Sequence, residues 1–135
     1  MDETFCSSCG GADFVRFTDE SFSIEHAGRT VTVTGLSGWR CQACGEVEFD
    51  PDSAHRYADA SDELVLKARE FERNEIRRIR RKLGLSQRMA ATLTGGGHNA
   101  FSRYERGDAV PMPAVVNLFK LLDKHPELLK ELIPL

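Results

Sequence analysis

The 135-residue sequence lacks both long apolar segments and the biased composition of a disordered chain. No apolar run approaches the roughly 20 residues that a membrane-spanning helix needs. Hydrophobic residues make up 41% and aromatic residues 8% of the chain, which is too much for a disordered acidic protein. The start, Met1 to Thr4, is acidic and resembles neither a secretory signal nor an Arg-rich transit peptide. We therefore expect a cytoplasmic protein that makes no membrane contact and folds as one domain or two small ones.

The sequence also lacks the motifs that place a catalytic base beside a metal. It contains no H-E-x-x-H segment, and no H-x-E segment followed by P-C-x-x-C. A catalytic zinc would need such a base and an open coordination position. We therefore expect that the protein is not an enzyme.

Charge is distributed unevenly along the chain. Residues 1–68 contain 13 Asp and Glu against 5 Lys and Arg, a net charge of −8, whereas residues 69–135 contain 8 against 13, a net charge of +5; the sum is the formal −3. Residues 73–106 contain nine Arg and Lys, opposed only by Glu75 and Glu105. This division predicts two modules with partners of opposite charge, and a polyanion as the partner of the second.

All four cysteines lie in the first third of the chain, in two C-x2-C pairs: Cys6, Cys9, Cys41 and Cys44. Each C-x2-C turn directs two thiolates at one point, and two such turns complete the tetrahedron that Zn²⁺ prefers. Gly10 and Gly45 follow the pairs, as a turn with positive φ requires. We expect a structural zinc ion, because four protein ligands leave no position for a reactive water.

Other uses of four cysteines are less compatible with this pattern. Disulfides are uncommon in a cytosolic protein, and a redox C-x-x-C motif would need one pair within a βαβ unit. Iron could also occupy a site of four thiolates, so the spacing alone leaves the metal open. His26 and His55 are potential ligands, but four cysteines already suffice, and we interpret both as ordinary polar residues.

The pattern between the two cysteine pairs indicates β-structure. Residues 22–25 and 31–34 alternate apolar and polar side chains around a possible turn at Ala27-Gly28, and Trp39 is expected to pack on the small core. A helix is expected to start at residues 50–53, where a proline and acidic residues occur together. The apolar stripe of this helix consists of Tyr57, Leu64, Ala68 and Phe71. The helical spacing of apolar residues is interrupted after it. This break places the module boundary between residues 71 and 72, although no Gly or Pro prevents a continuous helix.

The second module reads as a cluster of five helices. The first has Ile76, Ile79 and Leu83 on one face and stops at Gly84. The next is expected from Ser86 to about Thr94, and a third from His98 or Asn99 to Glu105, after a Gly-Gly-Gly break. A fourth opens at residues 111–113, and a last short one follows residue 126. The predicted fold class is therefore α+β with two domains: a β-rich, four-cysteine zinc-binding domain (1–71) and an all-α helix-turn-helix domain (72–135).

In a helix-turn-helix domain the second helix of the pair enters the major groove, and its first residues reach base edges. Here this helix offers Asn99, Ser102 and Arg103. Asn pairs with adenine and Arg with guanine through two hydrogen bonds each, and positions i and i+4 share one helix face. His98 lies at the same end of this helix. We expect it either to contact a phosphate or to have no role in binding DNA. Phe101 and Tyr104 point to the other side and are expected in the core.

These segments resemble the MqsA antitoxin family. The resemblance rests on both C-x2-C pairs in order, on the segment G-G-G-H-N-A-F-S-R-Y-E-R-G at residues 95–107, and on Pro111 and residues 121–129. Leu85-Ser86-Gln87, Ala91 and residues 103–107 also resemble the broader Cro/repressor type of helix-turn-helix. The resemblance covers nearly the whole chain and is weakest across residues 46–75.

The resemblance implies an antitoxin of a type II toxin–antitoxin pair. It implies that the zinc domain neutralises an MqsR-like ribonuclease toxin, which cleaves messenger RNA. It also implies that the helix-turn-helix domain dimerises and represses the operon by binding a palindrome in double-stranded DNA. By residue, it matches the four cysteines to the zinc ligands and Asn99 and Arg103 to the base-reading pair, and it suggests Gln87, Arg88 and Ser102 as phosphate contacts.

Two features depart from the family pattern. The linker lacks the proline expected there, which leaves open how flexibly the two modules are joined. His98 stands where a small apolar residue is expected, so a different operator preference follows. The alternative function is a stand-alone, zinc-containing helix-turn-helix regulator without a toxin partner. Both functions predict operator binding, and only a toxin partner separates them.

Overall fold

The computed structural model describes residues 5–133, which divide into two compact units between Leu66 and Lys67. In chain order the elements are β1 (Phe14–His26), β2 (Arg29–Cys41), β3 (Val47–Phe49), α1 (Pro51–Lys82), α2 (Gln87–Thr94), α3 (Ala100–Arg106), α4 (Pro113–Lys124), the 3₁₀ helix η1 (Pro126–Leu128) and α5 (Leu129–Leu132). This combination of a small antiparallel sheet and helices is consistent with the expected α+β class. No described helix has both the length and the apolar character that crossing a bilayer requires.

The sheet of the N-terminal unit is antiparallel, with strand order β1-β2-β3. Ala27 and Gly28 connect β1 to β2 with φ of 51° and 77°. Positive φ at both central residues is the type I′ geometry that suits the twist of a two-residue hairpin, and it confirms the predicted turn. Both strands are longer than the alternating segments that predicted them, and β3 was not predicted.

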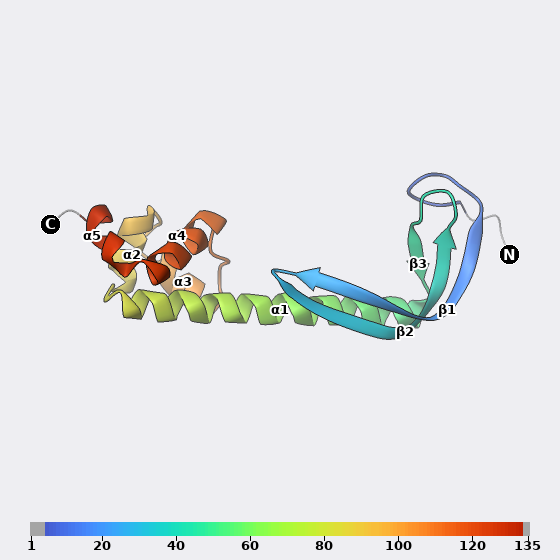
Figure 1. Ribbon diagram of the computed structural model, residues 1–135, viewed down its shortest axis with the longest axis horizontal. Helices are drawn as coiled ribbons and strands as arrows, with labels where there is room; N and C mark the ends of the chain where they lie inside the picture. Colours follow the sequence, from blue (N-terminus) through green and yellow to red (C-terminus); the bar gives the residue numbers. More distant parts are fainter. Residues whose placement is uncertain (1–4, 134–135) are drawn as a thin grey trace. The chain divides into compact units, whose positions relative to one another are not determined.

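The hairpin contains an irregularity that divides it into two halves (Figure 1). The β1–β2 register shifts on both sides of Glu20, and Asp19 in β1 has φ of 51°. Gly35, in β2, has φ of 70°. Such bulges bend a strand and increase its twist. As a result, the half near the turn packs along the start of α1, whereas the other half carries the cysteine loops at its end.

The core of the N-terminal unit lies between this half of the hairpin and α1. Its buried residues are Ile24, Val33, Leu36 and Leu64, joined by Phe22, Val31, Phe49, Tyr57 and Ala60. The ring of Phe49 lies 5.0 Å from the rings of both Phe22 and Tyr57. Trp39 does not belong to this cluster, contrary to expectation. It is half-buried, and the Arg16 guanidinium lies over its ring at 5.3 Å.

Hydrogen bonds attach the start of α1 to β2. The helix begins at Pro51, as predicted, and the Oγ of buried Ser53 accepts a hydrogen bond from the Ser37 N–H at 2.9 Å. One turn later, Arg56 donates to the carbonyl oxygens of Thr34 at 2.7 Å and Gly35 at 3.3 Å. The Ser53 bond satisfies a strand N–H and the Arg56 bonds satisfy strand carbonyls, none of which β3 reaches, because β3 pairs only with residues 38–40 of β2.

Helix α1 continues without interruption through the predicted phase break. The residues at the break, 72–75, are Glu, Arg, Asn and Glu, and none of them stops a helix as Gly or Pro would. The apolar stripe holds for Leu64 and Ala68, which are buried, but Phe71 is 56% exposed. The two units divide by their contacts after Leu66, so the domain boundary between residues 71 and 72 stays a prediction.

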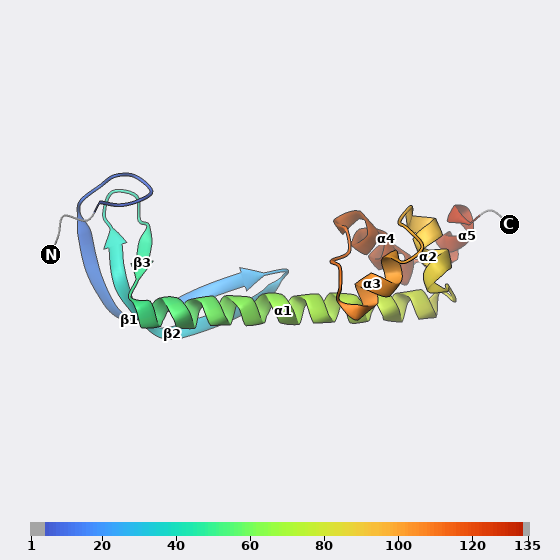
Figure 2. The ribbon, with the colours of Figure 1, turned by 180° about the vertical axis from the view of Figure 1, so that it is seen from behind.

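The C-terminal unit is a cluster of helices (Figure 2), and two phenylalanines lie in its core. Phe101 and Phe119 are fully buried with ring centroids 5.2 Å apart. Residues from α1, the loop between α1 and α2, α2 and α4 surround them, including Ile76, Ile79, Leu85, Ala90, Ala91 and Val115. The predicted helix ends are confirmed at Gly84, Gly95 and Gly107, which have φ of 71°, 79° and 83°. Helix α3 starts at Ala100, one or two residues later than expected, and Asn99 is its N-cap.

Candidate metal centre and nucleic-acid interface

The two cysteine pairs form turns with the same backbone pattern. In the first, the Cys6 N–H donates to Gly11 O and the Gly10 N–H donates to Cys6 O. In the second, the Cys41 N–H donates to Glu46 O and the Gly45 N–H donates to Cys41 O. Gly10 and Gly45 have φ of 75° and 79°, as the sequence predicted. Each turn therefore holds its two cysteines in the geometry of a metal-binding knuckle.

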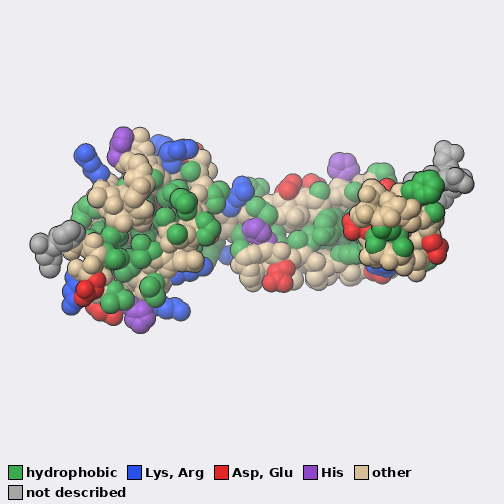
Figure 3. All heavy atoms as spheres, turned by 90° about the horizontal axis from the view of Figure 1, so that it is seen from above, with side chains coloured by type: hydrophobic (Ala, Val, Ile, Leu, Met, Phe, Trp, Pro, Cys, Tyr) green, Lys and Arg blue, Asp and Glu red, His purple; other side chains and the backbone are tan. Residues whose placement is uncertain are grey.

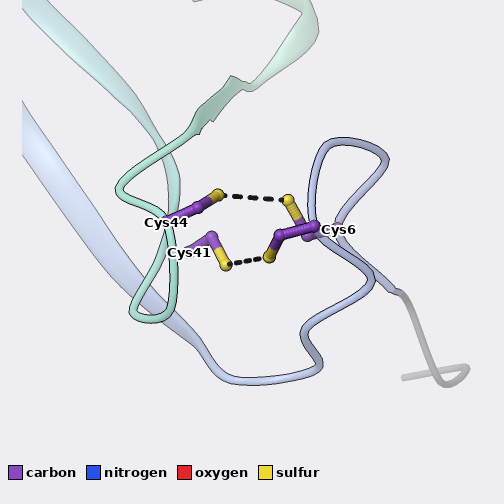
Figure 4. Close-up of side chains that lie close together, drawn as sticks. Cys6, Cys41 and Cys44 are labelled. Carbon is purple, nitrogen blue, oxygen red and sulfur yellow. Dashed lines mark hydrogen bonds between the residues drawn. The ribbon is translucent and has the colours of Figure 1, made fainter.

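The four sulfur atoms converge on one point (Figure 4). All of them lie within 4.8 Å of one another. The Sγ atoms of Cys6 and Cys44 are 3.6 Å apart, and those of Cys9 and Cys41 are 3.7 Å apart. A tetrahedron with Zn–S bonds of 2.3 Å has edges of ~3.8 Å, whereas a disulfide would need ~2.05 Å. The group is close enough to bind one metal ion and is compatible with structural zinc.

Crowding of the sulfur atoms creates a site that favours a cation. Backbone N–H groups of Cys9 and Ser8 lower the pKa of Cys6 to about 7. The pKa of Cys44 rises to about 12, because desolvation and its sulfur neighbours outweigh the hydrogen bond from the Glu46 backbone. Four thiolates at these distances repel one another unless a metal ion neutralises them. Metal binding therefore releases protons from this group.

Gly11 is a part of the centre that the sequence reasoning missed. Its N–H donates to the Cys9 Sγ at 3.3 Å, a bond that stabilises a coordinating thiolate. A Cβ at this position would meet the Cys9 Sγ at 3.2 Å and the Ala43 Cβ at 3.3 Å. The second glycine of the Gly10-Gly11 pair was the available signal. His26 and His55 are exposed and lie outside the group, which among the described residues consists of the four cysteines alone.

In the C-terminal unit, α2 and α3 form the predicted helix pair around a glycine turn. Ser86 caps α2, with its Oγ accepting from the Met89 N–H at 3.0 Å. Gly95 ends α2 in the left-handed conformation, and its N–H reaches the carbonyls of Ala91 and Thr92. Helix α3 then presents an inner face with Phe101 fully buried and Tyr104 half-buried, which confirms their expected place in the core.

The proposed base-reading residues lie on the opposite side of α3. Asn99 and Arg103 are both exposed, and the Arg103 N–H donates to Asn99 O at 3.0 Å, the i, i+4 bond that puts them on one face. The Asn99 side chain makes no cap hydrogen bond to the helix, so its amide is available to a base edge. Ser102 is half-exposed on the same helix. The structure thus brings the three predicted α3 residues to one accessible helix.

The remaining predicted contacts lie beside this helix in the chain. His98 is exposed in the turn before α3. Gln87 is half-exposed and Arg88 exposed, both in the first turn of α2. A helix N-terminus favours anions through its free N–H groups and its dipole, so this turn suits a phosphate contact. Their roles in binding DNA stay predictions.

The basic segment 73–106 contributes fewer free cations than its composition indicated. Five of its nine basic residues form ion pairs within the unit: Arg77 and Arg80 with Glu105, Arg78 with Glu75 and Asp123, Lys82 with Asp123, and Arg106 with Asp108. Arg73, Arg81, Arg88 and Arg103 make no ion pair within residues 5–133. Figure 3 shows Lys and Arg side chains spread over this unit. Internal ion pairs therefore account for much of the positive charge that suggested a polyanion.

Glu105 is the acid that sequence reasoning treated only as an opposing charge. Its side chain is 2% exposed and accepts from Arg80 Nε at 2.9 Å and from Arg80 Nη2 at 2.8 Å. Arg77 approaches the same carboxylate at 3.4 Å and donates to Glu105 O at 2.9 Å. An isolated buried carboxylate is strongly unfavourable, so the two arginines stabilise Glu105 in its buried position. The spacing of the basic residues along α1 could not reveal this partner, because Glu105 lies on another helix.

Comparison with known proteins agrees with this geometry. The sequence model of a family described as "Antitoxin component of bacterial toxin-antitoxin system, MqsA" matches residues 4–133. The protein "Antitoxin MqsA" of Escherichia coli (strain K12) is 39% identical over 113 residues, which cover 78% of this chain and 82% of that protein. The family match spans the cysteine centre and the helix pair together.

Proposed function

Because the chain belongs to the MqsA antitoxin family, we propose that it neutralises a ribonuclease toxin through its N-terminal unit and represses its own operon through its C-terminal unit. The family is one of antitoxins and not of enzymes, and an antitoxin acts by binding. The observation that carries the proposal is the presence, in one chain, of a four-cysteine centre and of an exposed Asn99–Arg103 pair in the second helix segment of the α2–α3 pair.

The charge of the N-terminal part supports a basic toxin as its partner. Residues 1–68 have a net charge of −8. A ribonuclease binds a polyanionic substrate, so its binding surface is commonly basic. An acidic surface increases the association rate with such a partner and disfavours binding of RNA to the antitoxin itself. In this proposal the toxin is MqsR-like and its target is messenger RNA.

A zinc ion held by the four cysteines is part of the proposal. When bound, zinc supplies a structural cross-link and not a reactive water, because protein sulfur fills all four positions. Cys6 and Cys9 precede β1, whereas Cys41 ends β2 and Cys44 follows it. The ligands therefore cross-link the start of β1 to the end of β2, at the open end of the hairpin. A unit of this size buries a limited core, and a metal cross-link compensates for that.

The proposed DNA mode uses α3 in the major groove and α2 against the backbone. Asn99 and Arg103 read bases, while Ser102, Gln87, Arg88 and His98 contact the sugar–phosphate backbone or the groove edge. A palindromic operator needs two such helices about one DNA turn apart, so the protein acts as a homodimer through its C-terminal unit. Toxin and DNA binding both place it in the cytoplasm.

Co-expression tests the proposal against a stand-alone regulator. The tagged chain is produced together with the small open reading frame next to it, and the complex is purified in two steps. We expect a small basic partner at a fixed ratio, which arrests growth when it is expressed alone and degrades messenger RNA. A neighbour that neither binds nor inhibits growth would overturn the toxin half, while binding to the upstream DNA would then identify a solitary repressor.

A further inference from the structure

Three arginines of α1 meet the C-terminal end of the short helix that carries the proposed base-reading residues. Arg73, Arg77 and Arg80 are spaced i, i+4 and i+7, which places them on one face of α1. Arg77 and Arg80 bind Glu105, the next-to-last residue of α3. Arg73 covers Gly107, where a Cβ would lie 2.7 Å from its Nη1. This face of α1 therefore contacts α3 through cationic groups.

One guanidinium in this group connects three segments of the C-terminal unit. Arg80 is 12% exposed, and its Nε and Nη2 bind the two carboxylate oxygens of Glu105 at 2.9 Å and 2.8 Å. Its Nη1 donates to Leu85 O, in the loop between α1 and α2, at 2.9 Å. A bidentate pair fixes both distance and direction, because guanidinium and carboxylate are planar. Arg80 thus fixes α3 relative to the loop that leads into α2.

Helix α3 has few other means of fixing its direction. It contains seven residues, Ala100–Arg106, and only Phe101 and Glu105 are fully or nearly fully buried. Phe101 anchors its start, and Glu105 lies one turn later. Ala100 and Tyr104 add partly buried contacts to the same core. Two buried anchors one turn apart define the axis of a short helix more closely than Phe101 and these partly buried contacts would alone. The axis in turn determines where Asn99 and Arg103 are presented.

We propose that Glu105, held by Arg80 and Arg77, is a positioning residue that sets the orientation of α3 for reading DNA sequence. In this arrangement Arg77 and Arg80 do not contribute phosphate contacts, because their guanidinium groups are directed at Glu105. The inference rests on the proposed DNA-binding function and refines it. It predicts that disturbing the Glu105 group lowers sequence discrimination and leaves electrostatic affinity unchanged.

The experiment compares Glu105→Gln with Glu75→Gln, a matched removal of one acidic group from the exposed Arg78 pair. Full-length protein is titrated with the DNA upstream of its own operon and with a scrambled duplex of equal length, at several salt concentrations. For Glu105→Gln we expect the ratio of the two affinities to fall about tenfold, with an unchanged salt slope. We expect Glu75→Gln to have the same ratio of the two affinities as the unaltered protein. An unchanged ratio for folded Glu105→Gln would overturn the proposal.

Two further measurements keep the test decisive. Arg80→Lys keeps the charge but loses the bidentate geometry; a lower ratio of specific to scrambled affinity at constant salt slope supports the proposal, and an unchanged ratio would contradict it. This variant carries the test if Glu105→Gln does not fold. Amide hydrogen exchange in free protein should be faster across residues 100–106 in Arg80→Lys, and equal rates would contradict the proposal. If the unaltered protein does not prefer the upstream DNA, the autorepression proposal fails, and exchange alone decides the role of Glu105.

Discussion

The salt dependence of DNA binding directly tests which basic residues contact phosphate and which form ion pairs within the C-terminal unit. Nine basic residues in segment 73–106 would give a dimer up to 18 phosphate contacts, but five of the nine form ion pairs and Arg73 lies against Gly107. Arg103 is assigned to base reading, so Arg81 and Arg88 remain for phosphate, which allows four contacts per proposed dimer. At about −0.9 per neutralised phosphate, this segment contributes a slope of log K against log salt near −3.6 instead of −16.

Arg88→Ala and Arg78→Ala separate the two classes of arginine. Arg88 is exposed without an ion pair in the described part of the chain, whereas Arg78 binds Asp123 at 2.8 Å and Glu75 at 2.7 Å. Loss of two Arg88 contacts per dimer should make the slope shallower by ~1.8, so that the affinity defect shrinks ~12-fold between 50 and 200 mM salt. Arg78→Ala should leave the slope as it is. The measurement is fluorescence anisotropy with a labelled duplex, and an equal change in both variants would refute this division.

Three predictions concern the stability of the two units. Cys41→Ser should remove the bound metal, measured as zinc per chain, and unfold the hairpin in circular dichroism, because a structural site and its fold form together; a metal-free variant with an unchanged spectrum would contradict it. Gly38→Ala should weaken β3 pairing, since a Cβ there would meet Glu48 O and lie 2.9 Å from Phe49 Cα; an unaltered melting temperature would disprove that contact. Phe101→Ala should cost on the order of 3–5 kcal/mol in denaturant unfolding of the C-terminal unit, because this ring is fully buried; a cost below about 1 kcal/mol would argue against its central place.

Local patterns predicted many of the elements and the four-cysteine group. The cysteine spacing identified a group whose sulfur atoms lie within 4.8 Å, and the glycine positions gave the helix ends at residues 84, 95 and 107. These features depend on neighbours in the chain, such as a turn that needs positive φ or a hydroxyl that caps the next helix. The Ala27-Gly28 turn followed from the same reasoning.

Features that depend on distant partners were not predictable from local patterns. The bend of the hairpin at Asp19 and Gly35 needs the pairing register of two strands. Trp39 was expected in the core because of its size, but its ring pairs with Arg16 from the neighbouring strand. The basic face of α1 was attributed to DNA because Glu105, its main internal partner, lies 25 residues away from Arg80. Charge counts alone do not distinguish a basic side chain that binds a ligand from one that forms an ion pair within the fold.

The separation of the cysteine pairs sets an order of events during synthesis. Cys6 and Cys44 are 38 positions apart, and Cys41 is also the last residue of β2. At 5–20 residues per second, a ribosome makes this interval in about 2–8 s. During that time the first two thiols have no partners, and the hairpin lacks the end of its second strand. The last residue of the hairpin and the second cysteine pair are therefore made together, and the core against α1 is complete only when the chain has been extended to Leu64.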